Sequence, residues 1–245
     1  MPKLLFQTLQ QNPVMIRSLA SAASLLALAA PAFAQTPLEQ ALAASADGPL
    51  YKFDLALSTG EVEALMKVDP SLPEGERLSV VSPAPDSWSE DFAKRVKNMK
   101  ANTDGDIWCQ EFAANIPANA ALVGETDTTA TYTFEPQPGA EPDDMDKVYK
   151  HLTGTGIVDK RSPAILNYEL VAKKAFKPMP VAKIKQFEMK IACDRAPDGR
   201  THVASLDLNL SGSAMMQSFS QTDRQRISNL QAIPQSGPKS GTGTK

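Results

Sequence analysis

The chain has 245 residues, with 25 basic and 28 acidic side chains and a formal charge of −3. A mildly acidic chain has no overall field that attracts nucleic acid, and this length fits one large domain or two small ones. Beyond residue 34, no apolar run approaches the ~20 residues that a membrane-spanning helix requires. Composition therefore argues against a nucleic-acid-binding protein and against a helical membrane protein.

Residues 1–34 have the three parts of a secretory signal peptide. Two basic residues and no acidic ones accompany an apolar stretch at 19–30, and an A-x-A site ends at Ala34. We predict cleavage after Ala34, a free mature chain and a periplasmic location. Met15 is an alternative start to Met1, and an uncleaved N-terminal anchor helix is the alternative to cleavage.

The rest of the chain is predicted to form one domain with short flanking segments. We expect a linker at 35–48, a single α+β domain at 49–233, and a disordered tail at 234–245 that is rich in Pro, Ser, Gly, Thr and Lys. All 28 acidic residues follow Ala34 and 23 of the 25 basic ones do, so the mature chain would carry a charge of −5.

Cys109 and Cys193 are the only cysteines. An even number of cysteines in an exported chain favours a disulfide, and two separate buried thiols are the alternative. A bridge would close a loop of 85 residues and contribute about 4–5 kcal/mol in the chain-entropy model. The absence of a C-x-x-C pair argues against a redox role.

The N-terminal third combines strands with one helix. Apolar residues alternate along 51–57 and 62–68 on either side of a Ser-Thr-Gly turn, which predicts a hairpin, and a short strand is expected at 77–82. The S-x-x-E pattern starting at Ser87 predicts a capped helix over 87–101. Its apolar stripe is expected to be core: Trp88, Phe92, Val96 and Met99.

The remaining chain is dominated by strand patterns. A strand or turn is expected at 107–112, a hairpin at 121–125 and 129–134, and a short helix starting at Asp143-Asp144 after an acidic loop. Five further strands are expected at 152–160, 164–173, 183–193, 201–211 and 215–221. Short turns between consecutive strands favour an antiparallel sheet with one buried face.

Local motifs identify no catalytic, cofactor-binding or metal-binding residue. Nucleophile-elbow, P-loop and zinc-protease patterns are absent, and Asp104-Gly105-Asp106 lacks the spacing of a calcium loop. His151 and His202 lie far from each other and from the cysteines, whereas zinc ligands usually come in closely spaced pairs.

Charge distribution provides the clearest functional signal. Residues 47–91 carry ten acidic and three basic side chains, whereas residues 147–195 carry eleven basic ones. A basic segment that includes Lys173, Lys174, Phe176, Lys177, Lys183, Lys185 and Lys190 is a candidate contact site for an anionic lipid, a lipopolysaccharide or an acidic envelope protein. The alternative is a sheet edge that lysines protect from aggregation.

The predicted fold is α+β: a curved, mostly antiparallel sheet of about seven to nine strands packed on one or two amphipathic helices. This architecture, in an exported chain, resembles the half-barrel carriers that move lipoproteins across the periplasm. The resemblance rests on architecture and compartment and transfers no site residues. We therefore expect a non-enzymatic protein that binds an apolar or amphiphilic ligand or an envelope component. An envelope enzyme without a recognisable motif and a structural partner protein are the alternatives.

Overall fold

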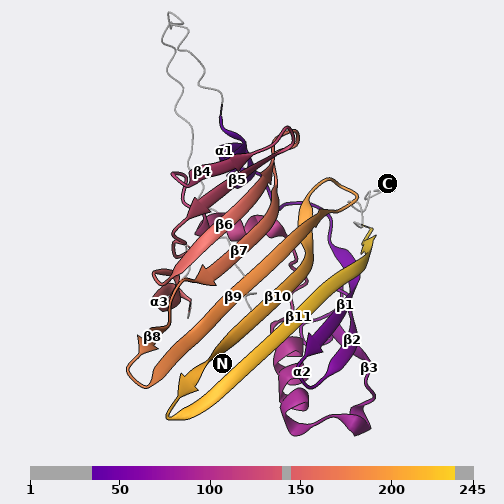
Figure 1. Cartoon of the computed structure of the whole chain (residues 1–245). Coiled ribbons are helices and arrows are strands. Elements are labelled where there is room, and N and C mark those ends of the chain that lie inside the picture. Colours follow the sequence, from indigo (N-terminus) through magenta and orange to yellow (C-terminus); the bar gives the residue numbers. More distant parts are fainter. Residues whose placement is uncertain (1–34, 140–144, 235–245) are drawn as a thin grey trace, which may run out of the picture.

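The computed structural model describes residues 35–139 and 145–234 and contains one open antiparallel sheet of eleven strands (Figure 1). The predicted signal peptide, the predicted helix start at Asp143-Asp144 and the C-terminal tail beyond 234 lie outside the described residues. The strand order is β3-β2-β1-β11-β10-β9-β7-β6-β5-β4, with β8 paired to β9. The α+β class is confirmed, while the prediction of seven to nine strands was too low.

Strands β1 (Tyr51–Thr59), β2 (Glu63–Val68) and β3 (Leu78–Ser82) form one end of the sheet. The side chains of β1 and β2 alternate between buried and exposed, as the sequence predicted, because successive residues of a strand point to opposite faces. The buried side packs on helix α2 (Glu90–Asn102) through Phe92, Val96 and Met99.

Helix α2 begins three residues later than predicted. Pro85–Ser87 forms a 3-10 turn, η1, and Ser89 caps α2 by accepting a hydrogen bond from the Phe92 amide at 3.2 Å. Trp88 therefore precedes the helix, where its indole donates to the Pro83 carbonyl and its ring packs edge-on against Phe92. Ser87 and Ser89 both precede the apolar stripe, so the local pattern alone did not show which serine caps the helix.

The other end of the sheet consists of β4 (Ala121–Glu125), β5 (Thr129–Phe134), β6 (Leu152–Asp159) and β7 (Ile165–Ala172), with the short helix α3 (Asp146–Tyr149) before β6. The hairpin of β4 and β5 has the predicted bounds. In β6 and β7, the buried residues pack into a second apolar cluster with Tyr168 and Ile165 at its centre.

Long strands join the two ends: β9 (Ala182–Arg195), β10 (Thr201–Ala214) and β11 (Gln217–Ala232), with β8 (Phe176–Met179) beside the start of β9. The sequence missed β8 and predicted β11 as a strand of seven residues beginning at Met215. Instead, Met215 and Met216 form the turn, and β11 pairs with β10 over its first half and with β1 over its second.

The segment 35–48 is more than a linker. It contains helix α1 (Pro37–Leu42), which Thr36 and Glu39 close with a capping box, and Leu38 and Ala41 are buried in the second cluster. Where a strand or turn was expected at 107–112, Trp108 forms a single bridge to His202 and the 3-10 helix η2 (Cys109–Asn115) follows. The predicted disulfide between Cys109 and Cys193 is present and ties η2 to β9.

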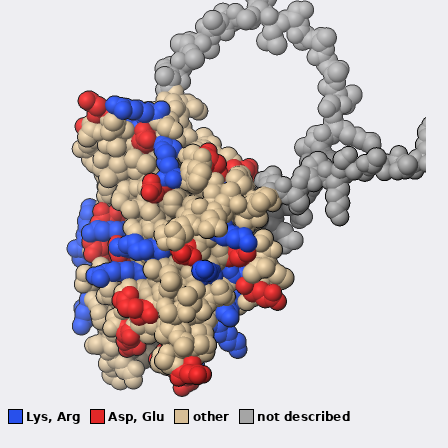
Figure 2. All heavy atoms as spheres, turned by 90° about the vertical axis from the view of Figure 1, so that its right-hand side faces the viewer, with Lys and Arg blue, Asp and Glu red and all other residues tan. Residues whose placement is uncertain are grey.

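The two faces of the sheet differ in chemistry. One face carries the apolar clusters and the helices, while β9, β10 and β11 present ion pairs such as Arg226–Asp207 and Lys190–Glu188 on the other. Viewed from the side of β1–β3 and α2, basic and acidic side chains are intermixed (Figure 2). Cations of α2 therefore lie among the acidic residues of the N-terminal segment, as in the pair of Lys94 with Glu90.

No helix within 35–139 and 145–234 combines the length and the apolar character needed to cross a lipid bilayer.

Candidate functional site

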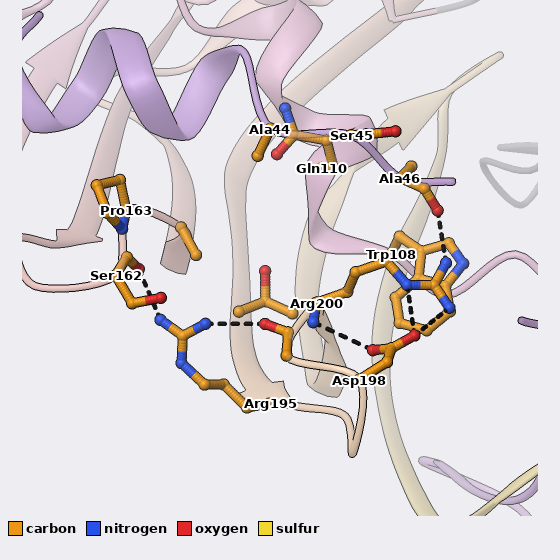
Figure 3. Close-up of a pocket in the computed structure, with 13 residues that line it drawn as sticks. Ala44, Ser45, Ala46, Trp108, Gln110, Ser162, Pro163, Arg195, Asp198 and Arg200 are labelled. Atoms are coloured by element: carbon orange, nitrogen blue, oxygen red, sulfur yellow. Dashed lines mark hydrogen bonds and ion pairs between the residues drawn. The ribbon is translucent and has the colours of Figure 1, made fainter. Parts of the chain in front are cut away.

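A polar pocket of about 340 Å³ lies where β9 turns into β10 (Figure 3). The segment after α1 forms one wall through Ala44–Ala46, and η2 contributes Gln110. The loop between β6 and β7 and the turn around Gly199 complete the lining. Two arginines, Arg195 and Arg200, supply the positive charge of this pocket.

Arg200 holds three segments together. Its guanidinium donates to the carbonyls of Ala46 at 2.5 Å and Pro49 at 2.6 Å, and its Nε donates to Asp198 at 2.8 Å. The group also lies 3.5 Å from the centre of the Trp108 ring. A side chain on Gly48 would come within 2.5 Å of the Arg200 guanidinium carbon, so a larger residue here would displace the guanidinium from these contacts.

Arg195 makes a similar set of contacts. It donates to the carbonyls of Gly199 at 2.8 Å and Ser162 at 2.6 Å and pairs with Asp159 at 2.9 Å. Burial raises the pKa of Asp159, but the contacts with Arg195 outweigh it, so the net pKa lies below the ordinary value. The same balance, with Arg200 as the partner, lowers the pKa of Asp198.

These contacts show that Arg195 and Arg200 have a structural role, because each links separate segments of the chain. Their hydrogen bonds go to backbone carbonyls and carboxylates of the chain itself, which leaves a ligand few donors to engage. Neither histidine lines the pocket. His151 stacks on Phe176 with ring centres 4.4 Å apart, and His202 is buried beside Trp108.

A different surface forms where two turns meet at the opposite end of β10. The turn from β8 to β9 and the turn from β10 to β11 lie side by side at the lower left of Figure 1. The Met215 amide donates to the Val181 carbonyl at 2.9 Å, and Ala214 lies opposite Ala182. Met179 also pairs with Ala182, so three strands converge here.

Four apolar side chains at these turns face solvent. Met216 is fully exposed, at 102%, Met215 is 77% exposed, Val181 56% and Met179 50%. We call these four residues the hairpin tip. Scattered exposed apolar residues are common on proteins, but a contiguous group of large ones marks a contact surface.

The turn that carries the two methionines is conformationally unfavourable for them. Met215 has φ of 50° and Met216 has φ of 66°, as a two-residue hairpin turn with positive φ at both positions requires. Asn and Gly suit this geometry, whereas other residues lose on the order of 1–2 kcal/mol in it. Neither the turn nor the core therefore explains why methionine occupies these positions.

Lysines lie in and before the two strands, β8 and β9, that meet at the hairpin tip. Lys173, Lys174, Lys177, Lys183 and Lys185 are all exposed, and we call them the tip lysines. Among the described residues, none of the five has an ion-pair partner. No acidic residue occurs from 173 to 185, and residues 211–222 carry no charge at all. The tip therefore combines exposed apolar groups with uncompensated positive charge.

No protein-family model, curated protein or solved structure matches this chain. The roles of its residues therefore come from their contacts. Of the seven residues predicted as an anionic contact, five are the exposed tip lysines, which lie before β8, in β8 and in the first part of β9. Phe176 and Lys190 differ from them.

Phe176 is 6% exposed, because its ring packs on His151 and into the second apolar cluster. It adds no apolar surface to the loop, contrary to the prediction. Lys190 lies on the outer face of β9, where it pairs with Glu188 at 2.5 Å and Glu169 at 3.4 Å. The hydrogen bond from Lys190 to Glu188 and the nearby carboxylates raise the pKa of this lysine. Lys190 therefore belongs to the ion pairs of the sheet.

The sequence did not identify Val181, Met215 and Met216 as part of this surface. Met215 and Met216 were assigned to a strand, because no Gly, Pro, Asn or Asp marks the turn. One local feature that sets this segment apart is the absence of any charged residue from 211 to 222. Only the pairing of β9 with β10 brings it next to the basic segment.

Proposed function

We propose that this chain is an exported, non-enzymatic protein that binds phosphate-bearing amphiphiles of the cell envelope through its hairpin tip. The observation that supports this proposal is the combination of four exposed apolar side chains with five exposed lysines that have no acidic partner among residues 35–139 and 145–234. Apolar groups gain free energy by entering the boundary between headgroups and acyl chains, and lysines gain it from anionic phosphates.

The expected binding energy has two comparable contributions. Complete burial of a large apolar side chain contributes about 1.5–3 kcal/mol, and partial entry into a membrane surface contributes part of this. Each lysine close to an anionic surface contributes about 1 kcal/mol. Together, the four apolar residues and the tip lysines would provide reversible binding without a membrane-spanning segment.

Vesicle flotation tests the proposal. We expect the protein to float with vesicles that contain phosphatidylglycerol, much less with pure phosphatidylcholine, and to be released as salt approaches about 1 M, where the Debye length is about 3 Å. Replacement of Lys174, Lys177 and Lys183 with glutamine should weaken binding about a hundredfold, from the loss of about 3 kcal/mol.

A matched control removes the same charge elsewhere. Lys67, Lys94 and Lys97 are exposed on β2 and α2, and their replacement with glutamine should leave binding unchanged. If wild-type protein ignores anionic vesicles at low salt, the proposal is wrong. Parallel assays with lipopolysaccharide micelles distinguish the two sources of phosphate.

The alternative explanation for the lysines, protection of a sheet edge, makes the opposite prediction. In that case wild-type protein would not bind vesicles, and the triple glutamine variant would remain folded but aggregate faster. Turbidity measured beside flotation separates the two explanations.

A further inference from the structure

The methionines of the described chain fall into two groups by exposure. Met66, Met99 and Met189 are buried in the two apolar clusters, and Met145 is half-buried. The three exposed methionines of the described residues all belong to the hairpin tip: Met179, Met215 and Met216. Susceptibility to oxidants follows exposure, so these three thioethers are the accessible ones.

We propose that Met179, Met215 and Met216 form an oxidation-sensitive site, at which conversion of the thioethers to sulfoxides releases the hairpin tip from its anionic amphiphile. The inference rests on the proposed function and adds its regulation. The chain's two cysteines are joined in a disulfide, so no thiol competes for the oxidant.

The chemistry requires only a peroxide. A sulfur lone pair attacks one oxygen of hydrogen peroxide, the O–O bond breaks, an S–O bond forms, and the other oxygen leaves as water after proton transfer. Sulfur loses two electrons and the peroxide gains them. The product is a polar sulfoxide in place of an apolar thioether, and sulfoxide reductases reverse the change.

The effect on binding follows from the position of the three side chains. Three of the four apolar groups of the hairpin tip become polar, while the tip lysines are unchanged. The fold should be unaffected, because these side chains are outside the two apolar clusters. Oxidation therefore removes the apolar part of the contact selectively and leaves a weaker, purely electrostatic one.

Limited treatment of the purified protein with hydrogen peroxide, followed by peptide mass spectrometry, tests the site itself. Sulfoxide should accumulate at Met179, Met215 and Met216 before it appears at Met66, Met99 or Met189. Comparable rates at the buried and exposed positions would overturn the assignment of the site. This measurement does not depend on what the hairpin tip binds.

Flotation with phosphatidylglycerol vesicles tests the release. Oxidised wild-type protein should bind at least roughly tenfold more weakly than untreated protein. Treatment with the two methionine sulfoxide reductases should restore binding, and circular dichroism should show the same fold throughout.

The triple variant Met179→Leu, Met215→Leu, Met216→Leu is the matched control. Leucine keeps the apolar surface but has no sulfur, so this variant should bind vesicles equally well before and after peroxide treatment. Equal loss of binding by wild type and variant would place the oxidation damage elsewhere and overturn the inference, as would full binding by oxidised wild type. Failure of untreated wild type to bind would instead overturn the proposed function, and the release with it.

Discussion

The two ends of strand β10 carry positive charge in different ways. At its start, Arg195 and Arg200 lie beside a disulfide and donate to carbonyls and carboxylates of three neighbouring segments. At its end, about 45 Å away along a strand of 14 residues, four apolar side chains are exposed. The tip lysines on the neighbouring strands are exposed too, and within the part of the chain that the structure describes they have no acidic partner. We call residues 193–203 with the Cys109–Cys193 disulfide the anchored end.

This difference distinguishes residues that stabilise the fold from residues that are available to bind a ligand. A cation that is surrounded by acceptors of its own chain stabilises the fold, and its removal leaves those acceptors unpaired. A cation without such partners contributes little to stability. An exposed methionine in an unfavourable turn also contributes little. Variants of the anchored end should therefore change the free energy of unfolding, and variants of the hairpin tip should change binding.

The largest expected effect comes from the disulfide. Simultaneous replacement of Cys109 and Cys193 with serine should lower the free energy of unfolding by about 4–5 kcal/mol, because the unfolded chain is released from a loop of 85 residues. Urea denaturation measures the loss. A decrease below about 1 kcal/mol would show that η2 and β9 are held together by other contacts.

Removal of the Arg200 side chain should have the next largest effect. Arg200→Ala leaves the carbonyls of Ala46 and Pro49 without donors and opens space beside Trp108, and we expect a loss of about 2–4 kcal/mol in urea denaturation. Lys177→Ala at the opposite end is the control and should change stability by less than about 0.5 kcal/mol. Equal effects at both ends would contradict the comparison.

Replacement of the two turn methionines should increase stability and weaken binding at the same time. In the double variant Met215→Asn, Met216→Gly, both residues favour positive φ, so the free energy of unfolding should rise by about 1 kcal/mol, while flotation with anionic vesicles decreases. Serine at both positions is a control that should weaken binding without the gain in stability. A turn variant that binds like wild type would exclude the methionines from the contact.

The smallest expected effect is a loss of folding stability on acidification, caused by His202 at the anchored end. Burial lowers the pKa of His202 below its ordinary value, although Asp194 opposes this shift. The unfolded state therefore binds the proton more readily, so the stability that His202 provides is complete above about pH 7 and decreases as pH falls through the ordinary pKa of about 6.5. Asp159 and Asp198, whose pKa values are lowered, stay ionised in this range.

Urea midpoints between about pH 7.5 and pH 5.5 measure this loss. The variant His202→Leu should depend less on pH than wild type over this range. An identical pH dependence of the two proteins would show that His202 is protonated in the fold without cost. Vesicle binding should follow salt and charge at the tip, independently of this histidine.

Local pattern predicted the elements whose chemistry is contained within a few residues. Alternation identified β1 and β2, and the pair of runs around Asp127 identified β4 and β5. Of the apolar stripe predicted for α2, Phe92, Val96 and Met99 are buried as expected, whereas Trp88 precedes the helix and is half-buried. The even cysteine count, in a chain expected to be exported, predicted the disulfide. In each of these cases, the spacing of apolar residues or the number of cysteines was sufficient for the prediction.

Local pattern did not predict segments whose structure depends on contacts with residues far away in the chain. The linker at 35–48 contains α1 because Leu38 and Ala41 pack into a distant apolar cluster. Phe176 was assigned to an exposed basic loop, but its contact with His151 buries it. Both errors arose because an isolated segment does not reveal which of its apolar side chains have a partner.

The sequence by itself determined an α+β chain with a basic segment, one disulfide and no recognisable catalytic motif, since these depend on composition and short spacings. Only the tertiary structure decided which charged side chains are paired with groups of the same chain. Arg200 finds its acceptors more than 150 residues earlier in the chain, and Met215 joins Val181 through strand pairing. Register between distant strands is set by the burial of the whole sheet face, so neither contact follows from neighbouring residues.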